Sequence, residues 1–244
     1  MSLLLILLSF PAGGSAAPAI TFKPADVPIP GFPGTGDILG AGAAVQAQYT
    51  ISGTESAGGL PSQLRKLAFY LPTNTRVHPA GFSPCSAGAL EATGPSACPK
   101  NSVAGPVGRA TVAAPIAGVT IFEPATVQAF AAPGGGLSFY NVGTSPIAAI
   151  IVAQGAFQAG GPGYGPELVV NIPPIKTVPE APNASVTAID VKVGAAIRKG
   201  RKTLYFGTNA TRCPKGGFRW KTELTFESGE VSTATATTKC PKSA

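Results

Sequence analysis

The chain is poor in the residues that enzymes use for acid, base and metal chemistry. Its 244 residues include 11 acidic side chains and one histidine, and only 12% of the residues are charged. The histidine, His78, precedes Pro79 in an expected turn and has no carboxylate near it in the sequence. The chain has no nucleophile-elbow motif, no zinc-protease motif and no phosphate-binding glycine loop. These absences argue against an enzyme, and the sequence predicts neither a cofactor nor a bound metal.

A pair of carboxylates for glycoside hydrolysis is the remaining route to catalysis, because such pairs come from distant strands. The best candidates are Glu223 and Glu227, which share one face of an expected strand. Their Cα atoms would lie about 13 Å apart along that strand, which is long for a cooperating pair. A secreted hydrolase is therefore the least favoured function.

Long hydrophobic runs are also missing. The longest lies near the start of the chain, where Leu3 to Phe10 form an apolar run of eight residues. A transmembrane helix needs about 20 residues, so no transmembrane anchor is expected. Small residues and an A-x-A pattern, Ala17-Pro18-Ala19, follow the run, which is typical of a secretory signal peptide although no basic residue precedes it. We expect residues 1–19 to be a signal peptide and the protein to be secreted.

The four cysteines are Cys85, Cys98, Cys213 and Cys240. An even number in an exported chain indicates disulfides, and four cysteines allow three connectivities. A zinc site is disfavoured because no C-x-x-C pair exists and the one histidine stands alone. We expect the cysteines to pair with their sequence neighbours, Cys85 with Cys98 and Cys213 with Cys240.

Glycine and proline, with 31 and 25 residues, lie between alternating apolar segments, which is how turns separate strands. No segment suits a long crossover helix, so a parallel α/β sheet is excluded. The one expected helix is short, from Ser86 to Glu91. The expected fold is all-β: an antiparallel β-sandwich of about 10–12 short strands with one short helix, stapled by two disulfides. The expected strands lie near 45–51, 67–71, 106–113, 118–123, 125–131, 136–142, 146–157, 166–172, 186–196, 202–206, 217–227 and 231–239.

Residues 20–42 carry four prolines among several glycines, which predicts an extended arm ahead of a β domain at 43–244. Three cysteines share the context Cys-Pro-Lys, at Cys98, Cys213 and Cys240. This repetition leaves open a second arrangement, in which two small β modules divide near residue 133.

The C-terminal third combines aromatic and basic residues. Alternation along 217–227 puts Phe218, Trp220 and Phe226 on one face, which we predict to be buried, while charged residues occupy the other face. The strongest basic cluster surrounds Gly200 in an expected hairpin turn. It is the candidate binding site for an anionic polymer, and its cations are Arg198, Lys199, Arg201 and Lys202.

Two stretches resemble a known group of proteins. The first has Pro79-Ala80-Gly81-Phe82 before Cys85 and Gly94-Pro95 before Cys98, and the second runs from Cys213 through Trp220 to Cys240. They resemble exported, disulfide-containing β-rich proteins of unknown function from high-GC Gram-positive bacteria, over most of residues 65–240. The resemblance implies secretion, a β-rich fold and disulfides, and it transfers no activity.

The net charge of +7 favours acidic partners. No nucleic-acid reading motif is present, so a nucleic-acid partner is not expected. The sequence therefore predicts a secreted, non-catalytic structural or binding protein of the cell surface or extracellular space. The alternative is a module that binds carbohydrate or an anionic cell-wall polymer. The sequence indicates neither the identity of the ligand nor an oligomeric state.

Overall fold

The structure, a computed structural model, describes residues 17–145, 148–177 and 182–242. Most of the expected signal peptide thus lies outside the described residues. The strands are β1 (Ala19–Val27), β2 (Ala44–Ser52), β3 (Leu64–Pro72), β4 (Arg76–Val77), β5 (Gly108–Ile116), β6 (Val119–Ala131), β7 (Leu137–Gly143), β8 (Ala149–Ala159), β9 (Tyr164–Asn171), β10 (Ser185–Val193), β11 (Ala196–Lys199), β12 (Lys202–Tyr205), β13 (Gly207–Thr208), β14 (Phe218–Phe226) and β15 (Val231–Thr238). The helical elements are α1 (Ala87–Thr93) and the 3-10 turns η1 (Pro79–Gly81), η2 (Gly94–Ala97), η3 (Lys100–Ser102) and η4 (Pro133–Gly135).

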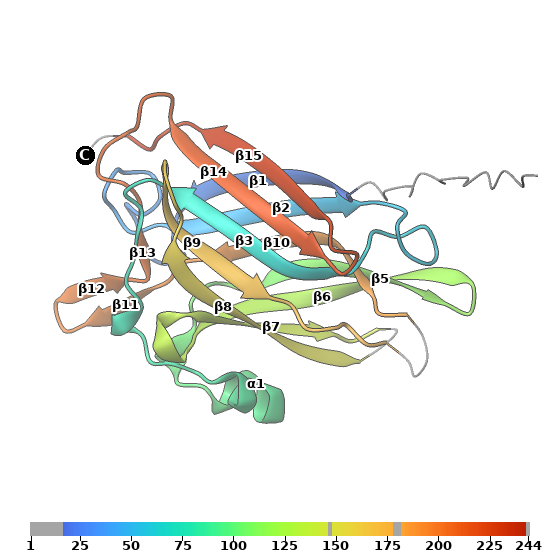
Figure 1. Cartoon of the computed structure of the whole chain (residues 1–244). Helices are drawn as coiled ribbons and strands as arrows, with labels where there is room; N and C mark the ends of the chain where they lie inside the picture. The colour runs from blue at the N-terminus through green and yellow to red at the C-terminus, as the bar shows by residue number, and fades with distance from the viewer. Residues whose placement is uncertain (1–16, 146–147, 178–181, 243–244) are drawn as a thin grey trace, which may run out of the picture.

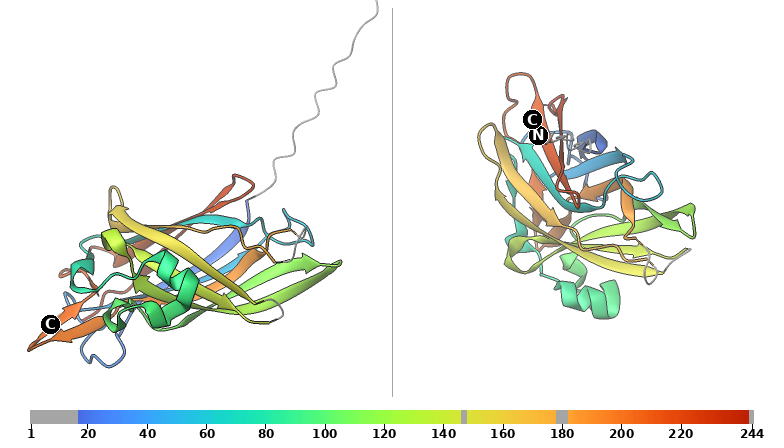
Figure 2. Two further views of the ribbon diagram at one scale, coloured as in Figure 1. Left: turned by 90° about the horizontal axis from the view of Figure 1, so that it is seen from below. Right: turned by 45° about the vertical axis from the view of Figure 1, so that its right-hand side comes forward.

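One antiparallel sheet of 11 strands makes up most of the molecule, in the order β1-β2-β10-β5-β6-β7-β8-β9-β3-β14-β15 (Figure 1). The sheet curls until its two edge strands, β1 and β15, lie side by side (Figure 2). At this seam the Ser232 hydroxyl of β15 donates to the carbonyl of Pro18, just before β1. The predicted all-β antiparallel fold with a short helix is confirmed, and its two layers are halves of one continuous sheet.

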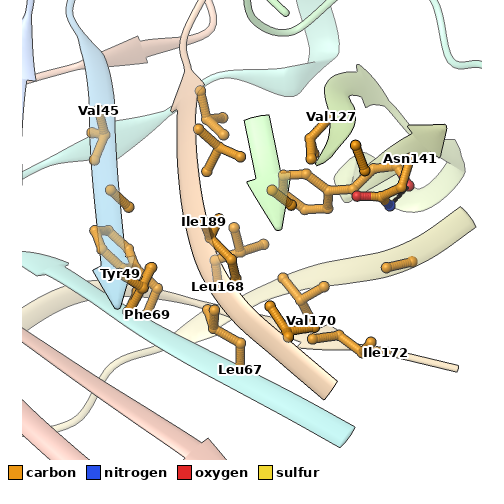
Figure 3. A pocket seen from close by; sticks show the side chains of 18 of the residues that line it. Val45, Tyr49, Leu67, Phe69, Val127, Asn141, Leu168, Val170, Ile172 and Ile189 are labelled. Carbon is orange, nitrogen blue, oxygen red and sulfur yellow. Dashed lines mark hydrogen bonds between the residues drawn. The ribbon is translucent and has the colours of Figure 1, made fainter. Parts of the chain in front are cut away.

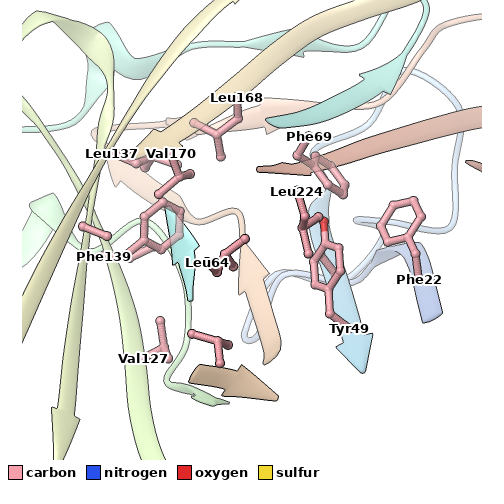
Figure 4. Close-up of a cluster of buried hydrophobic side chains, with 14 of the residues drawn as sticks. Phe22, Tyr49, Leu64, Phe69, Val127, Leu137, Phe139, Leu168, Val170 and Leu224 are labelled. Carbon is pink, nitrogen blue, oxygen red and sulfur yellow. The ribbon is translucent and has the colours of Figure 1, made fainter. Parts of the chain in front are cut away.

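The two layers meet through aromatic side chains. Phe22 of β1 contacts Phe69 of β3 edge to face, with 5.7 Å between the ring centroids, and Phe69 packs against Trp220 of β14. The hydroxyl groups of Tyr49 in β2 and Thr222 in β14 lie 3.1 Å apart and form a hydrogen bond between the layers. Figure 4 shows this cluster, in which aromatic rings and leucines from both layers interleave.

Alternation along β14 decides what is buried there. Phe218, Trp220, Thr222, Leu224 and Phe226 are all buried, as the alternation predicts, and the charged residues between them are more exposed. The Trp220 side chain is fully buried, and its indole N–H donates to the Thr238 hydroxyl at 2.9 Å. The predicted core position of Trp220 is confirmed.

The first half of the predicted arm is part of the sheet. Residues 19–27 form β1, which pairs with β2 along its whole length, from Ala19 opposite Ser52 to Val27 opposite Ala44. The prediction of an arm over 20–42 is therefore wrong for this segment. Prolines are tolerated in a strand that pairs through hydrogen bonds on one side only, and Phe22 and Pro24 alternate inward as in any other strand.

The strands before and after residue 133 interleave. β10 lies between β2 and β5, and β14 lies beside β3. A division into two modules near residue 133 is therefore wrong, because it would cut through a hydrogen-bonded sheet. The two strands predicted at 118–123 and 125–131 are one strand, β6. Pro124 is accommodated because β7 begins to pair only at Ala125, so Pro124 has a strand neighbour on one side.

The helix and one disulfide cover the outer face of the sheet at β6 to β8. Ser86 caps α1 as expected, since its hydroxyl accepts from the Ala89 N–H at 3.2 Å. Leu90 of α1 packs with Phe130 and Val152 in a second, smaller core. Both predicted disulfides, Cys85–Cys98 and Cys213–Cys240, are confirmed, with Cα atoms 5.3 and 5.8 Å apart. Among the described residues, no helix has the length and apolar character needed to cross a bilayer.

Candidate functional site

The curled sheet surrounds a cavity of about 190 Å³ that is partly open to solvent. Its wall is almost wholly apolar and is built by inward-facing side chains of β2, β3 and the run of strands from β5 to β10 (Figure 3). Val45 and Tyr49 of β2, Leu67 of β3 and Val170 of β9 are among the residues that enclose it. A concave space with this apolar lining is the kind of site in which proteins hold small molecules.

A row of small residues explains why the interior is hollow. Ala110, Ala125, Gly143 and Ala149 are consecutive partners across β5, β6, β7 and β8, and all of them line the cavity. Protein interiors are otherwise packed as densely as organic crystals. The three alanines of this row leave space that larger side chains would fill, and the absence of a side chain at Gly143 makes room for the Glu123 carboxyl group, so the sequence itself builds the cavity.

Polar side chains stand at the two ends of the apolar wall. Asp26 and Val193 both pair with Val45 of β2, so Asp26 lies level with the end of β10. Glu123 and Val186 both pair with Val112 of β5, so Glu123 lies level with the start of β10. Seven residues of strand separate these levels, which corresponds to roughly 20 Å. Asp26 and Asn209 mark one end, and Glu123 and Thr177 mark the other.

These end residues carry unpaired polar atoms. Seven buried side-chain polar atoms in the described part of the chain lack a hydrogen-bond partner, and four of them belong to residues that line the cavity. They are Asp26 Oδ2, Asn209 Oδ1, Glu123 Oε1 and Thr177 Oγ1. Buried polar groups in proteins are nearly always paired, so each exception needs an explanation. A bound molecule that supplies the missing partners is one such explanation.

Asp26 is the most perturbed carboxyl group of the site. The residue as a whole is only partly buried, but its Oδ2 atom is out of contact with solvent. This burial disfavours the charged form and raises the pKa of Asp26 to about 7. Glu123 is buried as well, at 7% exposure, and its carboxyl group occupies the space above Gly143, where a Cβ would lie 2.3 Å from Oε1.

The predicted basic site forms a hairpin at the Asp26 end of the cavity. β11 and β12 pair with Lys199 opposite Lys202, and Gly200 takes a φ of 60° in the two-residue turn between them. We call Arg198, Lys199, Arg201 and Lys202 the basic hairpin; all four are exposed. The hairpin lies in the sequence between Val193 and Phe206, which both line the cavity. In Figure 1 it projects from the main sheet.

The carboxylates considered for hydrolysis have separate cationic partners. Glu223 lies 2.7 Å from the Lys221 ammonium and accepts a hydrogen bond from the Tyr70 hydroxyl at 3.1 Å. The Lys221 contact keeps the pKa of Glu223 below its usual value. Glu227 lies 3.8 Å from Arg65. Glu223 lies on the outer face of β14 and Glu227 lies in the turn directly after it, and neither residue lines the cavity.

The remaining candidates for chemistry are dispersed. His78 is exposed after β4, with its Nε2 atom 3.3 Å from the Thr208 hydroxyl. Within the described ranges, no group of three or more histidine, cysteine or acidic side chains is placed to hold a metal ion.

Sequence reasoning missed the cavity. One signal was present in the sequence. Asp26 is four residues from Phe22, and Glu123 is four residues from Val127, so in a strand each acidic side chain faces inward like its apolar neighbour. A charged residue at an inward position marks a candidate site, because charged side chains are rarely buried without a partner. No protein-family model, curated protein or solved structure matches the chain.

Proposed function

We propose that this chain is a secreted, non-catalytic binding protein that holds a small apolar molecule inside its curled sheet. The observation that supports this most is the combination of an apolar cavity with unpaired polar atoms at both of its ends. Two disulfides are consistent with an oxidising compartment, where secreted proteins fold. The carboxylates considered for catalysis have other partners outside this cavity.

The cavity volume limits the size of the ligand. A cavity of about 190 Å³ is slightly larger than the roughly 150 Å³ engineered cavity that binds benzene in another protein. Sites for drug-sized molecules are larger, at roughly 300–1,000 Å³. We therefore expect a ligand of the size of a substituted benzene ring or a short alkyl chain.

Thermal unfolding in the presence of benzene or n-hexane tests the proposal. A molecule that binds only the folded state at 100 times its Kd stabilises that state by about 2.7 kcal/mol. For a domain of this size, that corresponds to a rise in Tm of roughly 5–10 °C. The absence of any rise with either compound would contradict the proposal.

A matched pair of variants locates the binding. Ala125→Leu introduces three carbon atoms into the middle of the small-residue row and should abolish the rise in Tm. Thr126→Leu places the same side chain on the exposed, outer face of β6 and should leave the rise unchanged. Ala153→Val, a smaller change of another cavity residue, should weaken the response if Ala125→Leu does not fold. An equal rise in Ala125→Leu and the parent would place the bound molecule elsewhere.

Binding of an anionic cell-wall polymer is a second candidate function. It is favoured by the basic hairpin, which exposes four cations around a single turn and is set apart from the main sheet. Such a surface would attract a polyanion through contacts that weaken as salt increases.

A further inference from the structure

The Asp26 end of the cavity carries two buried side-chain oxygens that have no hydrogen-bond partner. Asn209 is almost completely buried, at 2% exposure, and its amide nitrogen already donates to the Ile38 carbonyl at 3.0 Å. Its Oδ1 atom has no partner among the described residues, and neither has Asp26 Oδ2. The free hydrogen-bonding capacity at this end is therefore that of an amide oxygen, which only accepts, and a carboxyl oxygen, which accepts when ionised and can donate when protonated.

Both residues are held in place by the same segment of backbone. Asp26 lies opposite Val45 in the pairing of β1 with β2, and the backbone N–H of Asn209 donates to the carbonyl of Ala41 at 3.1 Å. Gly207, two residues before Asn209, accepts from the N–H of Ala43. The two side chains thus flank residues 41–45 and border the same end of the cavity. A ligand head group at this end would meet oxygens that the backbone has fixed in position.

The charges around this end restrict the head group further. Arg76 borders the cavity and is exposed, and the basic hairpin projects beyond this end with four more exposed cations. An ammonium head group would be repelled by these cations as it approached. A carboxylate head group only accepts hydrogen bonds, so it would leave Asn209 Oδ1 without a donor, and the ionised form of Asp26 would repel it. A hydroxyl group donates a hydrogen bond, carries no charge and costs far less to remove from water than either ion.

We propose that the ligand is a small apolar alcohol, with its hydrocarbon part in the cavity and its hydroxyl hydrogen-bonded to Asp26 at this end. This inference rests on the proposed function. It adds the chemical class of the ligand and the direction in which the ligand lies, with the hydroxyl toward the basic hairpin. Asn209 provides an acceptor at the same end.

Calorimetric titration of the disulfide-bonded protein with four compounds of equal chain length tests the head group. The compounds are n-hexane, 1-hexanol, hexylamine and hexanoate. We expect 1-hexanol to bind at least tenfold more tightly than hexylamine and hexanoate at pH 7. Tighter binding of hexanoate would indicate that the head group contacts Arg76, and tighter binding of hexylamine would indicate an ion pair with Asp26. Either result would overturn the proposal.

Asp26→Leu tests the contact itself. We expect its affinity for 1-hexanol to fall at least tenfold while its affinity for n-hexane stays within a factor of two to three of the parent. Asp37→Leu, at an exposed acidic residue, is the matched control and should bind both compounds as the parent does. Asp26→Asn retains an acceptor oxygen and should keep most of the affinity for 1-hexanol. This variant can also be measured if Asp26→Leu does not fold.

The outcomes separate this inference from the proposed function. If n-hexane binds the parent and Asp26→Leu binds 1-hexanol as tightly as the parent does, the cavity is a binding site but the alcohol is not held by Asp26. If none of the four compounds binds, the proposed function itself is wrong.

Discussion

The perturbed carboxyl group of Asp26 should make the stability of the protein depend on pH. A single substitution of Asp26 can separate this contribution from those of other groups. Burial raises the pKa of Asp26 from an ordinary value of 3.8 to about 7. The folded state therefore holds a proton that the unfolded state releases above about pH 4. Between the two pKa values, the contribution of Asp26 to stability should be most favourable near pH 4 and should decrease as the pH rises to about 7.

The size of the effect follows from the pKa. Each pH unit between the unfolded and folded values corresponds to about 1.36 kcal/mol, so the whole rise is worth about 4 kcal/mol. A domain of this size changes its Tm by roughly 2–4 °C per kcal/mol, which gives a fall of roughly 8–16 °C between pH 4 and pH 8. Asp26→Asn removes the titrating group and should remove this fall.

Two other carboxyl groups act in the opposite direction at lower pH. Burial raises the pKa of Asp190, but hydrogen bonds from Gln46 and Gln48, at 2.7 and 3.0 Å, outweigh it and leave the pKa lowered. The Lys221 contact lowers the pKa of Glu223. The stability that these two groups contribute is present above their unfolded pKa values and is lost as the pH falls through the lowered folded values. The range from pH 5 to 8 therefore reports mainly on Asp26.

Urea unfolding of the parent and Asp26→Asn at several pH values between 4.5 and 8.5 measures the difference. The free energy of unfolding of the parent should fall relative to that of the variant as the pH rises, with a slope of at most about 1.4 kcal/mol per pH unit. Parallel profiles for the two proteins would show that Asp26 is solvated in the folded state. That result would refute both the raised pKa and the unpaired state of this carboxyl group.

Three further outcomes follow from the structure and the sequence. Replacing both Cys213 and Cys240 with serine should lower the free energy of unfolding by about 2–5 kcal/mol, the usual cost of losing a disulfide from a secreted domain, and urea unfolding without reductant would detect it. An unchanged stability would contradict a structural role for this bond. Changing the four cations of the basic hairpin to glutamine should abolish salt-sensitive binding to cell-wall preparations while Tm stays within a few degrees, because exposed charges contribute little to stability. Equal binding by parent and variant would remove the second candidate function. N-terminal sequencing of the protein from culture supernatant should begin between Ala17 and Ile20, and a cytoplasmic protein with an intact Met1 would refute secretion.

The sequence predicted the strands, turns and disulfides that depend on residues close together in the chain. The alternation from Phe218 to Phe226 predicted both the strand and its buried face, and Gly200 between two basic pairs predicted the turn of the basic hairpin. The disulfides could be predicted because each joins cysteines that are neighbours in the sequence. β1 was missed because Pro24 and the three prolines that follow the strand suggested a linker, whereas its place in the sheet depends on pairing with β2.

The cavity could not be predicted because it depends on register between strands. Ala110, Ala125, Gly143 and Ala149 are unremarkable as single residues in four strands. They form a hollow only because hydrogen bonding aligns them in one row. The meeting of Asp26 with Asn209 at one end likewise joins residues that are far apart in the sequence.

The position of β10 between β2 and β5 has a consequence for the order of folding. Tyr49 of β2 pairs with Ile189 of β10, and the Gln48 amide bonds to a carboxylate 142 residues later in the chain. The N-terminal strands therefore cannot complete their pairing until nearly four-fifths of the chain has emerged. Contacts between such distant residues form slowly, because a long loop must close before any bond is gained. A chain with this topology therefore closes its sheet late, only after most of its length is available for pairing.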